Sequence, residues 1–160
     1  MGPARVKAIT PADVPAMRRN VAAGVRSYAA WAPAGWSAEP VVWEEAGIRA
    51  HLAAPGFLGW ITGDEAAHVA AYPAADEPGA FHLMHLFVAP EQQGTGIATA
   101  LHDRLVDGVR AAGGTVLRLR TPNGNARGVA FYEREGWAQH GSAGLAPHLG
   151  LKCVWMRRPV

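Results

Sequence analysis

The sequence has one cysteine, Cys153, among 160 residues, which excludes a disulfide within the chain and a metal site built from several cysteines. A reducing compartment is therefore expected. Long apolar runs are also missing, since none approaches the roughly 20 residues that a membrane span needs. The N-terminus has no apolar stretch before a small-residue cleavage site, so no secretory signal is expected. These absences together predict a cytoplasmic protein that does not bind a membrane.

An excess of charge of one sign is lacking too. Lys and Arg number 15 against 13 Asp and Glu, and no run of four or five like charges occurs. A nucleic-acid-binding surface needs a basic stripe, so no nucleic-acid partner is expected. Hydrophobic residues make up 49% and charged residues 18%, which is typical of a folded chain and not of a disordered one. The length fits one domain over residues 1–160.

The hydrophobic periodicity predicts a mixed α/β (α+β) chain. Strands are expected at 5–9, 57–62, 68–72, 80–88, 115–121, 137–140 and 151–156. Helices are expected at 10–30, 40–53, 94–112 and 125–134. The segment 140–148, between the last two strands, contains two glycines and is expected to be a flexible loop.

A glycine-rich segment joins the strand that ends at Val88 to the helix that follows. Gly94, Gly96 and the small Ala98 leave main-chain N–H groups uncovered at a helix N-terminus, where the helix dipole is positive. This arrangement suits a phosphate or diphosphate group. The spacing is neither G-x-G-x-x-G nor a P-loop, because no Lys-Ser/Thr pair follows. A glycine-rich helix start without any ligand is the alternative reading.

Two blocks of the sequence resemble the GCN5-related N-acetyltransferase (GNAT) family. Residues 93–98, Gln-Gly-Thr-Gly-Ile-Ala, match the family signature Gln/Arg-x-x-Gly-x-Gly/Ala. Residues 125–137 resemble its Asn-x-x-Ala-x-x-Φ-Tyr-x-x-x-Gly-Phe segment, with Gly128 in place of alanine and Trp137 in place of phenylalanine. The resemblance is specific over about 80–137. It implies one GNAT-like domain with a mixed, mostly antiparallel sheet of six to seven strands flanked by about four helices.

The resemblance implies that acetyl-CoA is a cosubstrate, with no metal. The diphosphate would lie on the main-chain N–H groups of Gln93, Gly94, Thr95, Gly96, Ile97 and Ala98. The pantetheine arm would run beside Leu86, Phe87 and Val88 like an added strand. Asn125 would hydrogen-bond the pantetheine or its loop; an ordinary helix N-cap is the competing interpretation.

Within this resemblance Tyr132 would face the thioester sulfur as a general acid, because the leaving thiolate needs a proton or a hydrogen bond. A phenol with a pKa near 10 donates fully to a thiolate of pKa about 8.5 only with help from geometry, so hydrogen bonding matters more than complete transfer. The alternative reading is a core tyrosine on a short amphipathic helix.

A general base is expected because an alkyl amine is about a thousandth neutral at pH 7. His82 and His85 are the candidates, since the pKa of an imidazole lies near 6.5. Strand alternation predicts that they point to opposite faces, although a bulge would change this. Otherwise both are sheet histidines and water takes the proton. Opposite faces also argue against a His-x-x-His metal pair.

The implied activity is transfer of an acetyl group to a primary amine of a small molecule or peptide, by direct attack in a ternary complex. A catalytically silent acyl-CoA-binding or sensing module is the alternative. Trp31, Trp36 and Trp43 lie where the family shapes its acceptor pocket, although packing of their loop explains them as well. The sequence does not identify the acceptor, and a homodimer is an expectation by analogy alone.

Overall fold

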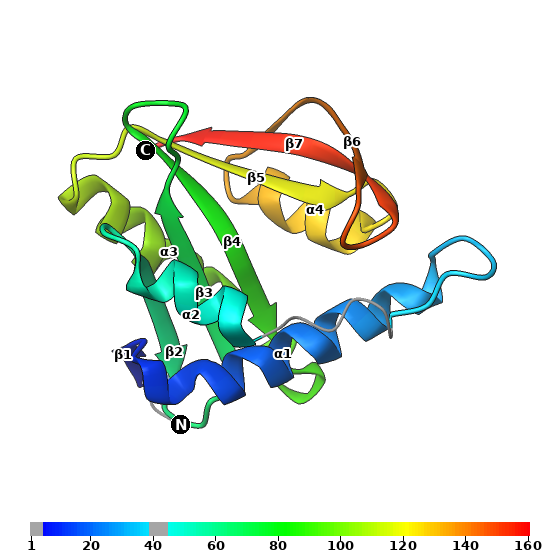
Figure 1. Ribbon diagram of the computed structural model, residues 1–160, viewed down its shortest axis with the longest axis horizontal. Helices are drawn as coiled ribbons and strands as arrows, with labels where there is room; N and C mark the ends of the chain where they lie inside the picture. The colour runs from blue at the N-terminus through cyan, green and yellow to red at the C-terminus, as the bar shows by residue number, and fades with distance from the viewer. Residues whose placement is uncertain (1–4, 39–44) are drawn as a thin grey trace.

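A computed structural model describes residues 5–38 and 45–160 (Figure 1). The strands are β1 (Val6–Ala8), β2 (Leu58–Thr62), β3 (Ala67–Pro73), β4 (Ala80–Val88), β5 (Val116–Pro122), β6 (Ala138–Ala146) and β7 (Leu151–Pro159). They form a seven-stranded sheet in the order β1-β2-β3-β4-β5-β7-β6. The pair β4–β5 is parallel and the other pairs are antiparallel, so the predicted mixed, mostly antiparallel sheet is confirmed.

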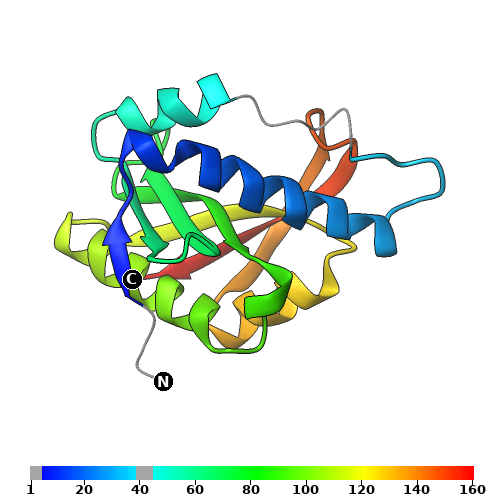
Figure 2. The same ribbon diagram turned by 90° about the horizontal axis from the view of Figure 1, so that it is seen from below.

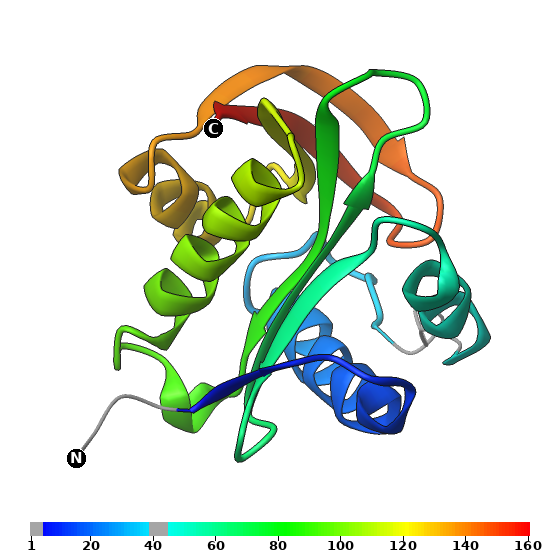
Figure 3. The same ribbon diagram turned by 90° about the vertical axis from the view of Figure 1, so that its left-hand side faces the viewer.

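Helices cover both faces of this sheet (Figures 2 and 3). They are α1 (Val14–Ser27), α2 (Glu45–Ala53), α3 (Ile97–Ala111) and α4 (Ala126–Arg134), with short 3-10 turns η1 (Pro11–Asp13), η2 (Tyr28–Ala30) and η4 (Pro90–Gln92). Helix α3 packs on β2, β3 and β4, whereas α1 packs on β3 and β4 and against α2. In the described ranges, 5–38 and 45–160, none of the helices has the length and apolar character that crossing a membrane requires.

The apolar stripe predicted for the segment 94–112 is the face that α3 buries. Leu101, Leu105 and Val109 are fully buried in a core that also includes Leu117 and Met156. Burial of a side chain of this size stabilises the fold by roughly 1.5–3 kcal/mol. The stripe therefore holds the start of α3 at a fixed place beside the sheet.

Two predicted elements need correction, and a third begins outside the described residues. The helix expected over 10–30 is divided into η1, α1 and η2. Helix α2 begins at Glu45, and the first residues of the helix expected from residue 40 lie outside the described residues. Segment 140–148 is not a loop, because β6 runs to Ala146. Gly141 and Gly144 have φ of +92° and +70°, and the pairing of β6 with β7 shifts register twice in this stretch. The glycines that allow these irregularities are also typical of loops, and for this reason the sequence predicts a loop where the structure has an irregular edge strand.

An irregularity in β4 changes which way its side chains point. Ala70 pairs with His85, but the next residue of β3, Ala71, pairs with Leu83, so Met84 is an extra residue in β4. A bulge of this kind moves the following residues to the other face. Leu83 before the bulge and Leu86 after it therefore both pack in the core under α3.

Strands β4 and β5 separate soon after they begin. They pair from Ala80 with Val116 to His82 with Arg118, and the rest of each strand has no partner in the other. Figure 1 shows the two strands diverging from this point. The backbone of β4 from Leu83 onward thus faces an opening in the sheet.

Two helical glycines predict opposite stability changes on substitution by alanine. A Cβ on Gly108 in α3 would overlap the ring of the buried Trp60, whereas a Cβ on Gly47 in α2 meets nothing within 4 Å. Alanine gains about 1 kcal/mol of helix propensity, and overpacking costs about 1–3 kcal/mol. We expect G108A to destabilise the protein by about 1–2 kcal/mol and G47A to stabilise it by about 0.5 kcal/mol in urea unfolding. A stabilising G108A would contradict the close packing of α3 on Trp60.

Candidate active site

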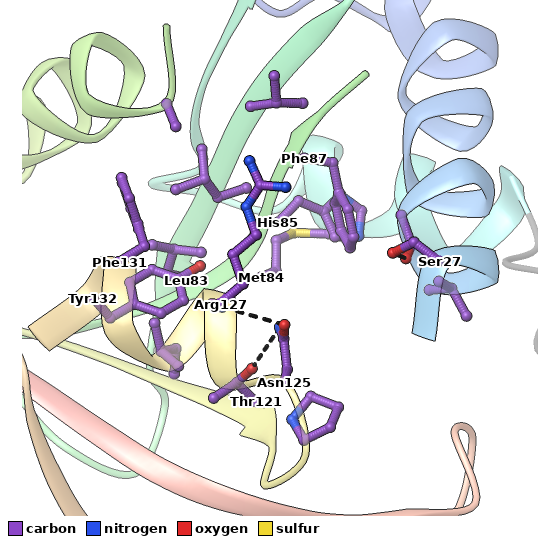
Figure 4. Close-up of a pocket in the computed structure, with 18 of the residues that line it drawn as sticks. Ser27, Leu83, Met84, His85, Phe87, Thr121, Asn125, Arg127, Phe131 and Tyr132 are labelled. Carbon is purple, nitrogen blue, oxygen red and sulfur yellow. Dashed lines mark hydrogen bonds between the residues drawn. The ribbon is translucent and has the colours of Figure 1, made fainter. Parts of the chain in front are cut away.

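A cavity of about 1080 Å³ opens where β4 and β5 diverge. Its walls come from α1, η2 and α2 on one side, from the start of α3 on another, and from α4 and the end of β5. Figure 4 shows His85 and Phe87 of β4 opposite Tyr132 and Asn125 of the α4 region. The structure therefore brings the two motif blocks, 93–98 and 125–137, to one cavity.

The loop before α3 presents main-chain N–H groups that lack a side-chain cap. The N-cap residue of α3 is Gly96, with φ +86°, and it provides no capping hydrogen bond. Gly94 also has a left-handed φ of +78°, and a Cβ on either glycine would point into open space. The first N–H groups of a helix have no partner within the helix and lie at its positive end. This site therefore has the geometry and the charge to hold an anion.

Almost all residues expected to bind the cosubstrate line this cavity. They are Leu86, Phe87, Val88, Gln93, Gly94, Gly96, Ile97, Ala98 and Asn125. Thr95 does not line it; its hydroxyl donates to the carbonyl of Gln92 at 2.5 Å and closes the turn. Thr95 thus stabilises the turn of the 93–98 loop, although it does not line the cavity.

Asn125 is the N-cap of α4, which confirms one of the two roles predicted for it. Its Oδ1 accepts a hydrogen bond from the Gly128 N–H at 3.2 Å, and its Nδ2 donates to Thr121 Oγ1 at 3.4 Å (Figure 4). A Cβ on residue 128 would overlap the Asn125 side chain, so this cap geometry requires the glycine found there. The role of Asn125 toward a pantetheine stays a prediction.

Arg127 is a residue of this site that the sequence motifs did not indicate. Its guanidinium donates to Gln93 Oε1 at 2.6 Å, and Gln93 Nε2 donates to the Val88 carbonyl at 3.4 Å. These contacts connect α4 to the anion-binding loop and bring a cation to it. Only the folded chain shows this, since 34 positions separate Arg127 from Gln93.

Tyr132 points into the cavity from α4 (Figure 4). Its ring packs against Phe131 and Trp137, with centroids 5.4 Å away in each case. Burial, with a smaller contribution from Tyr28, raises the pKa of the Tyr132 hydroxyl far above its ordinary value. The phenol therefore stays protonated at neutral pH and serves as a hydrogen-bond donor.

The expectation that His82 and His85 face opposite sides of the sheet is wrong. Because Met84 is a bulge residue, both imidazoles lie on the face covered by α1 and α2. His82 packs beside Tyr72, with ring centroids 5.3 Å apart. His85 Nδ1 lies 3.3 Å from Nε2 of the buried His68. Both candidates line the cavity, but the two rings have different neighbours.

Both imidazoles are uncharged at neutral pH. Burial, followed by Arg120 and Arg118, lowers the pKa of His82 to about 4. Burial and the neighbouring His68 lower the pKa of His85 well below its ordinary value. His82 can therefore accept a proton at pH 7, although it is a weaker base than an ordinary histidine. His68 Nδ1 accepts from the Asn20 amide, so His68 Nε2–H donates to His85 Nδ1 and neutral His85 carries its own proton on Nε2.

The pair His68–His85 predicts a loss of stability in mild acid. Burial lowers the pKa of His68 to about 3, and the pKa of His85 shifts in the same direction. The unfolded chain, with histidine pKa values near 6.5, binds these protons first, so folding stability falls as the pH drops below 6.5 toward the folded values. Two such groups remove about 2 kcal/mol between pH 6.5 and 5.5. Thermal unfolding across this range should show this loss, with a shallower dependence of Tm on pH in H68Q; an unchanged Tm would contradict the prediction.

The aromatic residues of the region 28–36 surround the outer part of the cavity. Tyr28 and Trp31 line it, with ring centroids 5.0 Å apart. Trp36 donates its Nε1–H to the Leu149 carbonyl at 2.8 Å and so joins this segment to the turn before β7. Trp43 lies outside the described residues. Cys153 also lines the cavity, and burial raises the pKa of its thiol, so the thiol is a poor nucleophile.

One group of side chains in the described ranges has a spacing that a metal ion could use. It consists of His102, Asp103 and Glu135, with His102 Nδ1 at 3.7 Å and 3.9 Å from the two carboxylates. Trp137 donates to His102 Nε2 at 2.8 Å, so neutral His102 carries its proton on Nδ1. That proton occupies the nitrogen a metal would need. The group is better described as a contact that joins α3 to the end of α4.

Comparisons with known proteins agree with this geometry. The model of the acetyltransferase (GNAT) family matches residues 26–137. PaiA N-acetyltransferase from Thermoplasma acidophilum, solved in complex with coenzyme A, has a TM-score of 0.80 at 14% identity and covers 99% of this chain and 100% of that chain. A search of curated proteins finds no match.

Two further solved structures have the same fold. A putative acetyltransferase of the GNAT family from Desulfovibrio desulfuricans has a TM-score of 0.75 at 22% identity, covering 98% of this chain and 99% of that chain. The ribosomal-protein-S18-alanine N-acetyltransferase from Escherichia coli has a TM-score of 0.72 at 19% identity, covering 98% and 93%. At these identities the likeness shows the fold alone.

Proposed function

Since the chain belongs to the acetyltransferase (GNAT) family, we propose that it transfers an acetyl group from acetyl-CoA to a primary amine of a small molecule or peptide, by direct attack in a ternary complex. One observation carries this proposal. The start of α3 with its uncapped N–H groups, the edge of β4 that β5 leaves unpaired and Tyr132 all border one cavity.

The residues of this cavity fit the parts of the proposed cosubstrate. The loop at 93–98 holds the diphosphate through its main-chain N–H groups, and Arg127 adds a positive charge beside them. The backbone of Leu86–Val88 pairs with the amides of the pantetheine arm, because β5 leaves that edge of β4 open. Bound in this way, acetyl-CoA supplies an activated acetyl thioester.

Tyr132 acts at the leaving sulfur. Because its phenol is buried and protonated, it donates a hydrogen bond to the negative charge that develops there. Around a buried group such a bond is stronger than it is in solution, because the local dielectric constant is lower. The raised pKa of the phenol makes this hydrogen bond, and not complete proton transfer, its main contribution.

His82 is the proposed acceptor of the amine proton. It is neutral at pH 7, lines the cavity and belongs to the strand beside which the pantetheine lies. A base with a pKa of about 4 cannot hold a proton taken from an alkylammonium group, so His82 passes it to water. His85 is the second candidate, although its ring is engaged with His68.

Two measurements test the proposal. Calorimetry with CoA should show binding at one site per chain, and a thiol-detection assay should show release of CoA from acetyl-CoA with amines from a broad panel. Failure of CoA to bind would refute the proposal. Tight binding without turnover of any amine would support a silent acyl-CoA-binding module instead.

A further inference from the structure

The acceptor side of the cavity has a distinct chemical character. Side chains of β3, β4, β5 and α2 meet there: Tyr72, His82, Arg120 and His51 all line the cavity. His51 stacks on Tyr72 with ring centroids 4.5 Å apart, and Tyr72 in turn lies beside His82. This surface offers aromatic and imidazole rings around one guanidinium.

The described residues of this lining include no carboxylate. Of the described residues that line the cavity, none is an aspartate or a glutamate. Two acids close to Arg118 on β5 already have partners: Asp76 pairs with Arg118 at 2.5 Å, and Glu77 pairs with Arg157 at 2.6 Å. A polyamine or another polycation needs carboxylates to replace the water around its ammonium groups. The described lining cannot supply them.

Arg120, by contrast, has a charge that no carboxylate of residues 5–38 or 45–160 neutralises. Its guanidinium lies 5.5 Å from the ring centroid of Trp155. Stacking uses the flat face of a guanidinium and leaves the N–H groups at its edge available, and these match the two oxygens of a carboxylate. Trp155 thus supports Arg120 in a conformation suited to a planar anion.

The position of Arg120 is central to this surface. Its charge influences Tyr72, His82 and Cys153, which come from three different strands. Arg118, two residues earlier on β5, also lies near Trp155. Its guanidinium, however, already forms ion pairs with Asp76 and Glu77. Arg120 is therefore the cation that a ligand entering from the acceptor side would meet.

We propose that the acceptor is a small amino carboxylate, a molecule with a primary amine and a carboxylate, and that Arg120 binds the carboxylate. This inference rests on the proposed acetyl transfer and narrows its acceptor. The neutral amine nitrogen forms a bond to the acetyl carbon while the carbon–sulfur bond breaks. One amine proton leaves to water, and CoA departs as a thiolate that is hydrogen-bonded by Tyr132 and then takes up a proton from water. A nearby cation also favours the neutral amine, which is the form that attacks.

Matched pairs of acceptors test the inference. Each amino acid of a panel, including ω-amino acids, is compared with its amide and with its decarboxylated amine in the thiol-release assay. The acids should have kcat/KM at least tenfold above their partners. In R120Q this preference should fall ten- to hundredfold, mainly through KM, since one charged pair of hydrogen bonds is lost. In R118Q, which removes the same charge from the same face, the preference should change less than threefold.

Equilibrium binding of the same pairs to the protein–CoA complex gives a readout that does not need turnover. Acids should bind more tightly than amides, and R120Q should remove the difference. Equal binding of acid and amide, preference for spermidine, or no binding of any acid would overturn the inference while leaving acetyl transfer to other amines possible. Failure of CoA to bind would instead reject the proposed function itself.

Discussion

Replacing Tyr132 with phenylalanine should lower kcat by on the order of a hundredfold while CoA affinity changes less than threefold. The substitution removes only the hydroxyl, which points into the cavity, and keeps the ring that packs against Phe131 and Trp137. A hydrogen bond aimed at developing charge acts mainly in the transition state, so its loss lowers kcat and not binding. Steady-state kinetics with saturating acetyl-CoA, together with calorimetry on CoA, measure both quantities.

A suitable control is Y28F, because Tyr28 also lines the cavity and burial raises the pKa of its hydroxyl to about 12. Loss of that hydroxyl should lower kcat much less than loss of the Tyr132 hydroxyl. Unchanged turnover in Y132F would remove Tyr132 from the mechanism. An equal loss in both variants would point to general disturbance of the cavity.

Replacing Gly96 with alanine should weaken CoA binding on the order of a hundredfold. The new Cβ would point into the open space in front of the uncapped N–H groups, where the diphosphate is proposed to lie. A charge-assisted hydrogen bond is worth about 1.5–3 kcal/mol, so the loss of even one costs tenfold or more in affinity. Calorimetry of the variant with CoA measures the change.

Gly113, at the other end of α3, provides the matched control. It has φ +83° against +86° for Gly96, and a Cβ there also meets nothing within 4 Å. The left-handed conformation costs alanine about 1–2 kcal/mol at either position, so both variants should lose similar stability. Only G96A should lose affinity for CoA. Similar affinities in the two variants would argue against the 93–98 loop as the diphosphate site.

Much of the fold was predictable because its signals are local. The stripe Leu101–Leu105–Val109 indicates α3, and Asn125 indicates the start of α4, since helical periodicity and capping depend on neighbouring residues. The loop at 93–98 was predictable for the same reason, because glycines before a helix indicate a left-handed backbone conformation that other residues rarely adopt. These parts of the chain carry the family resemblance as well.

The acceptor side could not be predicted in this way. Arg120 alternates with leucines on β5 and thus resembles an ordinary polar strand residue; its place beside Tyr72 and Trp155 follows from strand order and not from spacing. Arg127 likewise meets Gln93 only across the folded chain. Contacts of this kind depend on tertiary structure, which residue patterns do not contain.

The extra residue at Met84 has a consequence for how spacing on strands is interpreted. A regular strand could turn only one of His82 and His85 toward α1 and α2, and the other would be driven into the aliphatic interior beneath α3. Deleting Met84 should therefore do more than shorten β4, because it would turn His85 toward the core under α3 and Leu86 away from it. Two polar side chains three positions apart can thus share one surface when a single inserted amino acid resets the alternation between them.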